Sequence, residues 1–238
     1  MSGGADRAPL WQEEAVAALV HELRTPVTTI RALSEMMLDA PDMDGSERQG
    51  FLSIIAAESQ RLGRLVDEVM DAARLGSDEA ELQLGPVDLG GLLREAARLA
   101  APLLAGKDAR IALELSAGSV AVRGDRDRLL QVLLNLLSNA AKMVPGQGGR
   151  ITVSLETGPE AVIRVRDNGP GILAGQHEAV FQPFRRLGPQ GTRPPGTGLG
   201  LPISRRIVEG HGGTWGAEPA EGACFVIRLP VPPTEGSA

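Results

Sequence analysis

A histidine and an acidic residue stand side by side near the start of the chain, in the run His21-Glu22-Leu23-Arg24-Thr25-Pro26. The apolar residues around it recur every three or four positions, as on a helix with one apolar face, and His21 falls about 150° from the centre of that face. We expect His21 to face water, with Glu22 able to polarise its imidazole and Thr25 one turn further along the exposed face. Pro26 removes a backbone donor and is expected to loosen the helix there. His21 is thus a candidate reacting side chain, although a lone histidine more often has a structural role.

Polar side chains also share one face of a later predicted helix. Asn135, Asn139 and Lys142 follow one another at steps of four and three residues, with leucines around them. Two amides and an ammonium group beside so much leucine are costly unless a polar ligand meets them. The spacing indicates a ligand site, and a solvated polar stripe is the alternative interpretation.

Two glycine-rich runs follow that helix. Asp167-Asn168-Gly169-Pro170-Gly171-Ile172 comes directly after an apolar strand, where an acid can accept a hydrogen bond from an adenine amino group and glycine lets backbone approach the ring. An ordinary turn is the alternative explanation of such a run. Gly196-Thr197-Gly198-Leu199-Gly200-Leu201 precedes a predicted helix, whose free amide groups can receive phosphate oxygens. This second run has neither the dinucleotide-binding nor the Walker pattern.

The candidate histidine requires a long helix, and the first part of the sequence predicts two. Apolar periodicity predicts a helix over about residues 11–38, followed by a turn at residues 41–45. Ser46, with Gln49 three residues later, is typical of a capping box that opens a second helix ending near Gly76. A single hairpin cannot bury its own apolar stripe. We therefore predict a homodimer in which two hairpins form a four-helix bundle.

The rest of the sequence predicts a second domain of α+β type. Asp88 and Asp125 are expected to cap helices that run to about Ala105 and Met143. We expect strands at residues 110–115, 120–123, 151–156, 161–166, 214–215 and 224–229, and a further helix at 201–209. The chain is accordingly divided into a helical domain (residues 11–76), a linker (77–85) and a second domain (86–231), followed by a disordered tail.

The composition excludes several classes of protein. The 238 residues include 30 Gly and 17 Pro, too many helix breakers for a bundle alone, and only two Trp and four Phe, so Leu, Ile, Val and Ala must fill the core. A formal net charge of −6 argues against nucleic-acid binding, because no basic excess exists to neutralise phosphates. The single cysteine, Cys224, cannot form an internal disulfide, which favours a reducing compartment. No apolar run approaches the ~18 residues of a membrane span.

Taken in order, these motifs resemble those of sensor histidine kinases of the commonest dimerisation class, over nearly the whole chain. The run that begins at His21 is similar to the H-box of that family. The resemblance implies that His21 accepts the γ-phosphoryl group of ATP and that Glu22 is the general base. It also implies that Thr25 positions water when the enzyme dephosphorylates its partner.

The later motifs resemble the boxes that bind Mg-ATP in the same family. The resemblance to the N-box implies that Asn139 binds Mg²⁺, that Asn135 supports the metal and the phosphates, and that Lys142 contacts phosphate; hard oxygen ligands suit this metal. Met143 and Val144 depart from the residues usual after the N-box lysine. The resemblance to the two glycine boxes implies ATP binding by Asp167, Gly169, Gly171, Gly196, Gly198, Leu199 and Gly200.

A lid is implied between the two glycine boxes. Phe181-Gln182-Pro183-Phe184 resembles the F-box of the family, and core packing is part of its expected role. The segment 185–195 is then the lid over the nucleotide. Its arginines, Arg185, Arg186 and Arg193, either reach the γ-phosphate or form a solvated charge cluster. His177 and His211 match no motif, and we assign them no chemistry.

The resemblance implies an ATP-dependent protein-histidine kinase that autophosphorylates His21 and phosphorylates an aspartate of a cognate response regulator. The implied fold is a helical dimerisation domain followed by an α/β sandwich of the type shared with DNA gyrase and mismatch-repair ATPases. Three alternatives stay open: a phosphatase of the regulator, a scaffold that docks regulators without using ATP, and a gyrase-type ATPase. We expect a cytoplasmic location, within a longer sensor protein at the inner face of the cell membrane.

Overall fold

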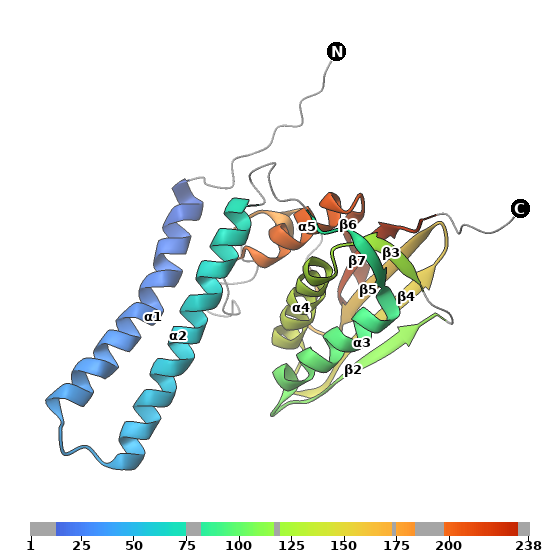
Figure 1. The fold of residues 1–238 in the computed structure, drawn as a ribbon. Helices are drawn as coiled ribbons and strands as arrows, with labels where there is room; N and C mark the ends of the chain where they lie inside the picture. Colours follow the sequence, from blue (N-terminus) through green and yellow to red (C-terminus); the bar gives the residue numbers. More distant parts are fainter. Residues whose placement is uncertain (1–12, 75–81, 117–119, 173–174, 184–197, 233–238) are drawn as a thin grey trace, which may run out of the picture.

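The computed structural model describes residues 13–74, 82–116, 120–172, 175–183 and 198–232. Within these ranges a helical hairpin is followed by a domain in which helices cover a sheet (Figure 1). The hairpin consists of α1 (Glu13–Asp39) and α2 (Gly45–Arg74). The second part contains, in chain order, β1 (Gly85–Asp88), α3 (Leu89–Ala100), the 3₁₀ turn η1 (Ala101–Leu104), β2 (Asp108–Leu115), β3 (Ala121–Gly124), α4 (Arg126–Met143), β4 (Gln147–Thr157), β5 (Glu160–Asp167), the 3₁₀ turn η2 (Ala179–Phe181), α5 (Gly200–Gly210), β6 (Thr214–Ala220) and β7 (Gly222–Pro230).

The start of α2 corrects the predicted capping box. The helix begins at Gly45, and Asp44 rather than Ser46 supplies the cap: its Oδ2 accepts a hydrogen bond from the Ser46 backbone N–H at 3.0 Å. Ser46 lies within the first turn, where its own N–H is one of the donors that need an acceptor. The predicted box with Gln49 was therefore wrong by two residues.

In the described part of the chain, five strands form the main sheet in the order β2-β4-β5-β7-β6, and only the β2–β4 pair is parallel. Strands β1 and β3 form a separate antiparallel pair, in which Val87 lies opposite Val122. Strand β1 was not predicted from the sequence, because four residues that include Pro86 are too few to show an alternating pattern.

Helices α3, α4 and α5 lie against one face of the main sheet (Figure 1). The strands β4 and β5 alternate buried and less buried residues, so one face of each enters the core. The core is filled mainly by Leu, Ile, Val and Ala, as the composition predicts. The predicted caps are confirmed: Asp88 accepts from the N–H groups of the first turn of α3, and Asp125 does the same for α4.

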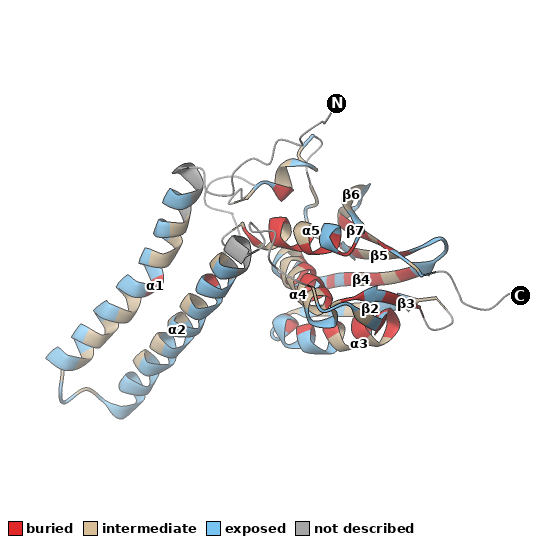
Figure 2. Cartoon of the chain, turned by 45° about the horizontal axis from the view of Figure 1, so that its top comes forward, coloured by how far each residue is buried: buried red, intermediate tan, exposed pale blue. Residues whose placement is uncertain are grey.

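The hairpin is packed against the second part through the C-terminal half of α2. Leu65 is buried, Val69 packs against the core of the sheet domain, and α2 contacts α5 (Figure 1). Most of the remaining hairpin surface is exposed, in contrast to the interior of the sheet domain (Figure 2). None of the helices in the described ranges is long and apolar enough to cross a membrane.

Candidate functional site

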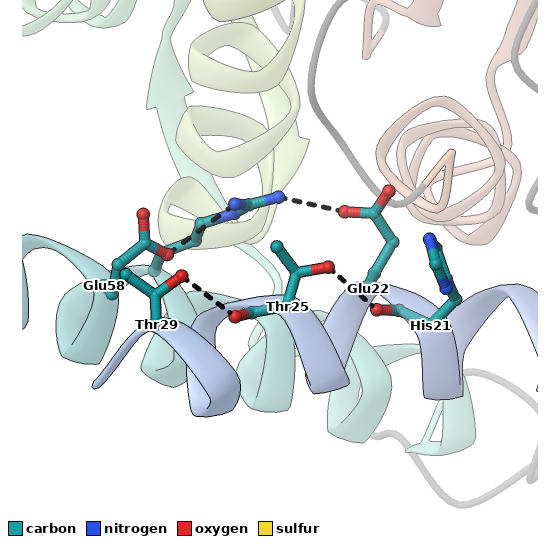
Figure 3. A network of polar contacts seen from close by, with 6 residues as sticks. His21, Glu22, Thr25, Thr29 and Glu58 are labelled. Atoms are coloured by element: carbon teal, nitrogen blue, oxygen red, sulfur yellow. Dashed lines mark hydrogen bonds and ion pairs between the residues drawn. The ribbon is translucent and has the colours of Figure 1, made fainter. Parts of the chain in front are cut away.

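The first part of the candidate site lies on α1. His21 is exposed, as its position opposite the apolar stripe predicts. Figure 3 shows its ring and the carboxylate of Glu22 projecting from the helix to the same side. An exposed imidazole next to a carboxylate has the two groups that a nucleophile and its general base require.

Glu22 is held by an arginine that was not predicted from the sequence. Arg61 of α2 donates from Nη2 to Glu22 Oε2 at 3.0 Å, and its Nη1 lies 3.6 Å from Glu58 Oε2. The Glu22 and Arg61 side chains are 16% and 30% exposed, so the pair is partly shielded from water. Because Arg61 follows Glu22 by 39 positions, only the pairing of α1 with α2 brings the two together.

Two threonines of α1, Thr25 and Thr29, make local contacts. Thr25 is exposed, and its Oγ1 donates to the carbonyl oxygen of His21 at 3.3 Å (Figure 3). Thr29 repeats this contact one turn later with the carbonyl of Thr25. Pro26, which lies inside the helix and is buried, cannot donate to the Glu22 carbonyl. The helical hydrogen bond to the Glu22 carbonyl is therefore missing, although α1 continues through this position.

The second part of the candidate site is built on α4. Asn135 donates from Nδ2 to Ser204 Oγ of α5 at 2.9 Å, and Asn139 Nδ2 lies 3.5 Å from Asn135 Oδ1, a long hydrogen bond. Lys142 follows near the end of the helix and is exposed. The predicted common face of the helix is thus present, and its first amide contacts α5.

Asp167 lies at the end of β5 with little exposure to solvent. Its Oδ1 accepts from the N–H groups of Gly169 at 2.8 Å and Ala223 at 3.4 Å. Burial raises the pKa of this carboxyl above its ordinary value, although the two N–H donors oppose the shift. Gly171 lies in the loop beyond it, opposite Gly222. A Cβ at Gly222, where φ is +83°, would lie 1.9 Å from the Asp167 carbonyl oxygen, so only glycine fits there.

The second glycine run is described only from residue 198. Gly198 has a positive φ of 73°, Leu199 is fully buried, and Gly200 opens α5. Leu199 therefore anchors the run in the core beside α4 and α5. Gly196 lies outside the described residues, as do Phe184, the three predicted phosphate arginines and the lid segment 185–195.

Phe181 of the predicted F-box is part of an aromatic cluster. Its ring lies 5.8 Å from that of Trp215 and 6.3 Å from that of Phe225, both in edge-to-face geometry, and the guanidinium of Arg205 lies 5.5 Å from its centroid. The expected core role of Phe181 is confirmed. These rings pack where η2, α5, β6 and β7 meet.

Two buried or partly buried polar residues turn out to support α4. His211, after α5, accepts the Asp125 N–H at Nε2 (2.8 Å), so its proton is on Nδ1, which donates to the Ile207 carbonyl at 2.7 Å. Lys107 Nζ donates to the carbonyls of Ala141 at 2.7 Å and Val144 at 3.3 Å, at the other end of the helix. No motif or spacing in the sequence predicts either contact.

The asparagines on this face of α4 fit Mg²⁺ bound together with a phosphate ligand. They offer amide oxygens, which are hard donors. Among the described residues, no group of three or more His, Cys, Asp or Glu could hold a metal ion by itself. A cation here would therefore keep water or phosphate oxygens among its ligands, as Mg²⁺ prefers.

Two family models match separate parts of the chain. Residues 11–78 match the His Kinase A (phospho-acceptor) domain, and residues 124–233 match the histidine kinase-, DNA gyrase B-, and HSP90-like ATPase family. The probable sensor histidine kinase TcrY of Mycobacterium tuberculosis is 40% identical over 219 residues, which cover 91% of this chain and 45% of TcrY. The chain thus spans less than half the length of this relative.

Solved structures are similar as well. The mycobacterial sensor histidine kinase MprB is 31% identical, with a TM-score of 0.56 over 63% of this chain and 99% of the MprB chain. The histidine kinase ThkA, crystallised in complex with the response regulator protein TrrA, is 28% identical, with a TM-score of 0.71 over 94% of this chain and 63% of that chain.

Proposed function

The chain belongs to the sensor histidine kinase family, and on this premise we propose that it autophosphorylates His21 with ATP and transfers the phosphoryl group to an aspartate of a cognate response regulator. The observation that carries the proposal is the exposed His21 beside the Glu22 carboxylate, in one chain with the asparagine face of α4. A protein that only hydrolysed ATP would not need an exposed histidine beside a carboxylate.

The proposal assigns one role to each part of the chain. Residues 11–76 form the dimerisation and phosphotransfer domain, residues 77–85 the linker, and residues 86–231 the ATP-binding domain. The two family matches, at residues 11–78 and 124–233, support this division. The expected location at the inner face of the cell membrane stays a prediction.

In the ATP-binding domain, the nucleotide lies between α4 and the two glycine runs. Asp167 accepts a hydrogen bond from the adenine amino group, and Gly169 and Gly171 leave space beside the ring. Asn139 holds Mg²⁺ with support from Asn135, and Lys142 contacts phosphate. Gly196, Gly198, Leu199 and Gly200 present backbone N–H groups to the phosphates at the start of α5. Bound Mg²⁺ supplies neutralisation of phosphate charge.

The chemical step belongs to α1. Glu22 accepts the proton from one ring nitrogen of His21, and the other nitrogen forms a bond to the γ-phosphorus as the bond from phosphorus to the ADP oxygen breaks. The exposed position of His21 lets a nucleotide held by another domain reach it. Most of the rate enhancement comes from positioning and charge neutralisation. The Arg61 contact fixes the direction in which the Glu22 carboxylate points.

The hairpin dimerises in this proposal. Apolar side chains remain exposed on both helices: Val16, Val20, Val27, Leu52, Ile54, Val66 and Met70 are each 41–50% exposed. A second hairpin would cover such a surface and complete a four-helix bundle. Light scattering at micromolar concentration should therefore give twice the chain mass of 24.9 kDa.

The response regulator docks along the exposed face of that bundle, beside His21. The complex of ThkA with TrrA supports a partner of this class. Glu22 and Thr25 also provide the groups for dephosphorylating the regulator, so we propose a phosphatase activity alongside the kinase. Measuring both reactions with the same regulator separates the two activities.

Autophosphorylation tests the proposal directly. His21→Gln should abolish labelling from γ-labelled ATP and leave nucleotide binding intact, whereas the matched control His177→Gln should keep the label. Asn139→Ala should remove Mg-ATP binding. Labelling that persists in His21→Gln would overturn the assignment of the phosphoacceptor, and unchanged affinity in Asn139→Ala would overturn the metal role.

A further inference from the structure

Ser204 is buried in the second turn of α5, with 2% of its surface exposed. The buried polar residues of the described chain are Asp167, Ser204 and His211, and each has a hydrogen-bond partner. The partner of Ser204 is Asn135, which donates from Nδ2 to Oγ at 2.9 Å. A buried hydroxyl is costly unless it is paired, so this contact favours one arrangement of α4 against α5.

Gly200 and Ser204 lie one turn apart on the same face of α5 and together form a slot for the Asn135 carboxamide. A Cβ at position 200 would lie 2.3 Å from Asn135 Oδ1, so only glycine leaves room for that oxygen. The carboxamide is thereby fixed between two helices: Nδ2 faces Ser204, and Oδ1 faces Gly200 and Asn139.

The orientation of Asn135 extends to Asn139. Asn139 Nδ2 is directed to Asn135 Oδ1 at 3.5 Å. The oxygen and nitrogen of a carboxamide diverge from the same carbon, so Asn139 Oδ1 points away from Asn135. Oδ1 is the atom that can bind a cation, whereas an amide nitrogen cannot. If Asn135 were free to rotate, Asn139 could present its NH₂ group instead.

We propose that Ser204 is a positioning residue of the Mg-ATP site, which acts through Asn135 to keep the oxygen of Asn139 turned toward the cation. This inference rests on the proposed function of the ATP-binding domain. It also gives Asn135 a structural role, because this side chain joins the end of the phosphate-binding run, at Gly200, to the metal-binding helix. Groups that orient a metal ligand typically change metal affinity by about 10–100-fold when removed.

The matched pair Ser204→Thr and Ser204→Val tests the proposal, because the two side chains share a shape and differ in the hydroxyl. Binding of ATP is measured by calorimetry with excess Mg²⁺ and again in EDTA. We expect Ser204→Thr to bind Mg-ATP within about twofold of the wild type and Ser204→Val to bind about tenfold more weakly. In EDTA the two variants should bind ATP with equal affinity, since adenine contacts do not involve Ser204. Thermal unfolding of both variants shows whether added volume alone disturbs the fold.

A double-mutant cycle separates a positioning role from a merely structural one. If Ser204 acts through Asn135, adding Ser204→Val to Asn135→Ala should weaken Mg-ATP binding no further. Equal Mg-ATP affinity of the Thr and Val variants, or additive losses in the cycle, would overturn the positioning role alone. Absence of Mg-ATP binding in the wild type would overturn the proposed function and this inference with it.

Discussion

His21 and His211 should respond to substitution in opposite ways. His21 is exposed on α1, whereas His211 is 7% exposed and bridges α5 to the first residues of α4. His211→Ala leaves the Asp125 N–H without its acceptor, at a cost of about 1–3 kcal/mol. Loss of the ring from its packed position adds about 1 kcal/mol. We expect a total loss of about 2–4 kcal/mol, while His21→Gln should change stability by less than about 0.5 kcal/mol.

The fluorescence of Trp215 reports on the unfolding of the sheet domain, where it packs against Phe181. The sequence contains two Trp, so a Trp11→Phe background leaves Trp215 as the sole indole. A loss of about 2–4 kcal/mol lowers the unfolding midpoint by roughly 4–16 °C in a domain of this size. His211→Gln retains an acceptor of similar reach and should lose less.

Autophosphorylation should show the opposite pattern to thermal unfolding in these two variants. Below its lowered midpoint, His211→Ala should still incorporate label from ATP, because His211 touches neither His21 nor the α4 asparagines in its hydrogen bonds. His21→Gln should unfold like the wild type and incorporate none. An unfolding midpoint of His211→Ala within about 1 °C of the wild type would refute the hydrogen-bond reasoning.

Three further changes test the site. Asp167→Asn should weaken ATP binding about tenfold or more. This substitution should also stabilise the free protein at pH 7, because the raised pKa of Asp167 means that folding stability is lost as pH rises through the folded-state pKa. The gain in the free energy of unfolding, measured with denaturant, should therefore be smaller at pH 4 than at pH 7. An equal gain at both pH values would contradict this explanation. Gly200→Ala should weaken Mg-ATP binding by about tenfold or more in calorimetry, because its Cβ would meet Asn135 Oδ1; affinity within about twofold would show that α5 shifts freely. Arg61→Met should slow autophosphorylation about tenfold by releasing Glu22, with Arg61→Lys retaining most of the rate; equal rates for the two would remove the positioning role of the charge.

Local interactions explain which features could be predicted from the sequence. The two hairpin helices, the caps at Asp88 and Asp125 and the strands β4 and β5 depend on periodicity and on neighbours within four residues. The same local reasoning failed where two competing signals were adjacent, as at Asp44 and Ser46. It also failed for β1, which is too short to show a period.

The order of the motifs, the helical position of His21 and the residue types suited to Mg-ATP can all be predicted from the order of residues along the chain. The groups that orient these residues come together only when the chain folds. Arg61 reaches Glu22 across 39 positions, Ser204 reaches Asn135 across 69, and His211 reaches Asp125 across 86. A partly buried polar group needs a hydrogen-bond partner, and tertiary packing supplies that partner. The two residues can be far apart in the chain, so no periodic pattern in the sequence predicts the pair. The reacting residues can therefore be predicted from the sequence, whereas the residues that hold them in place cannot.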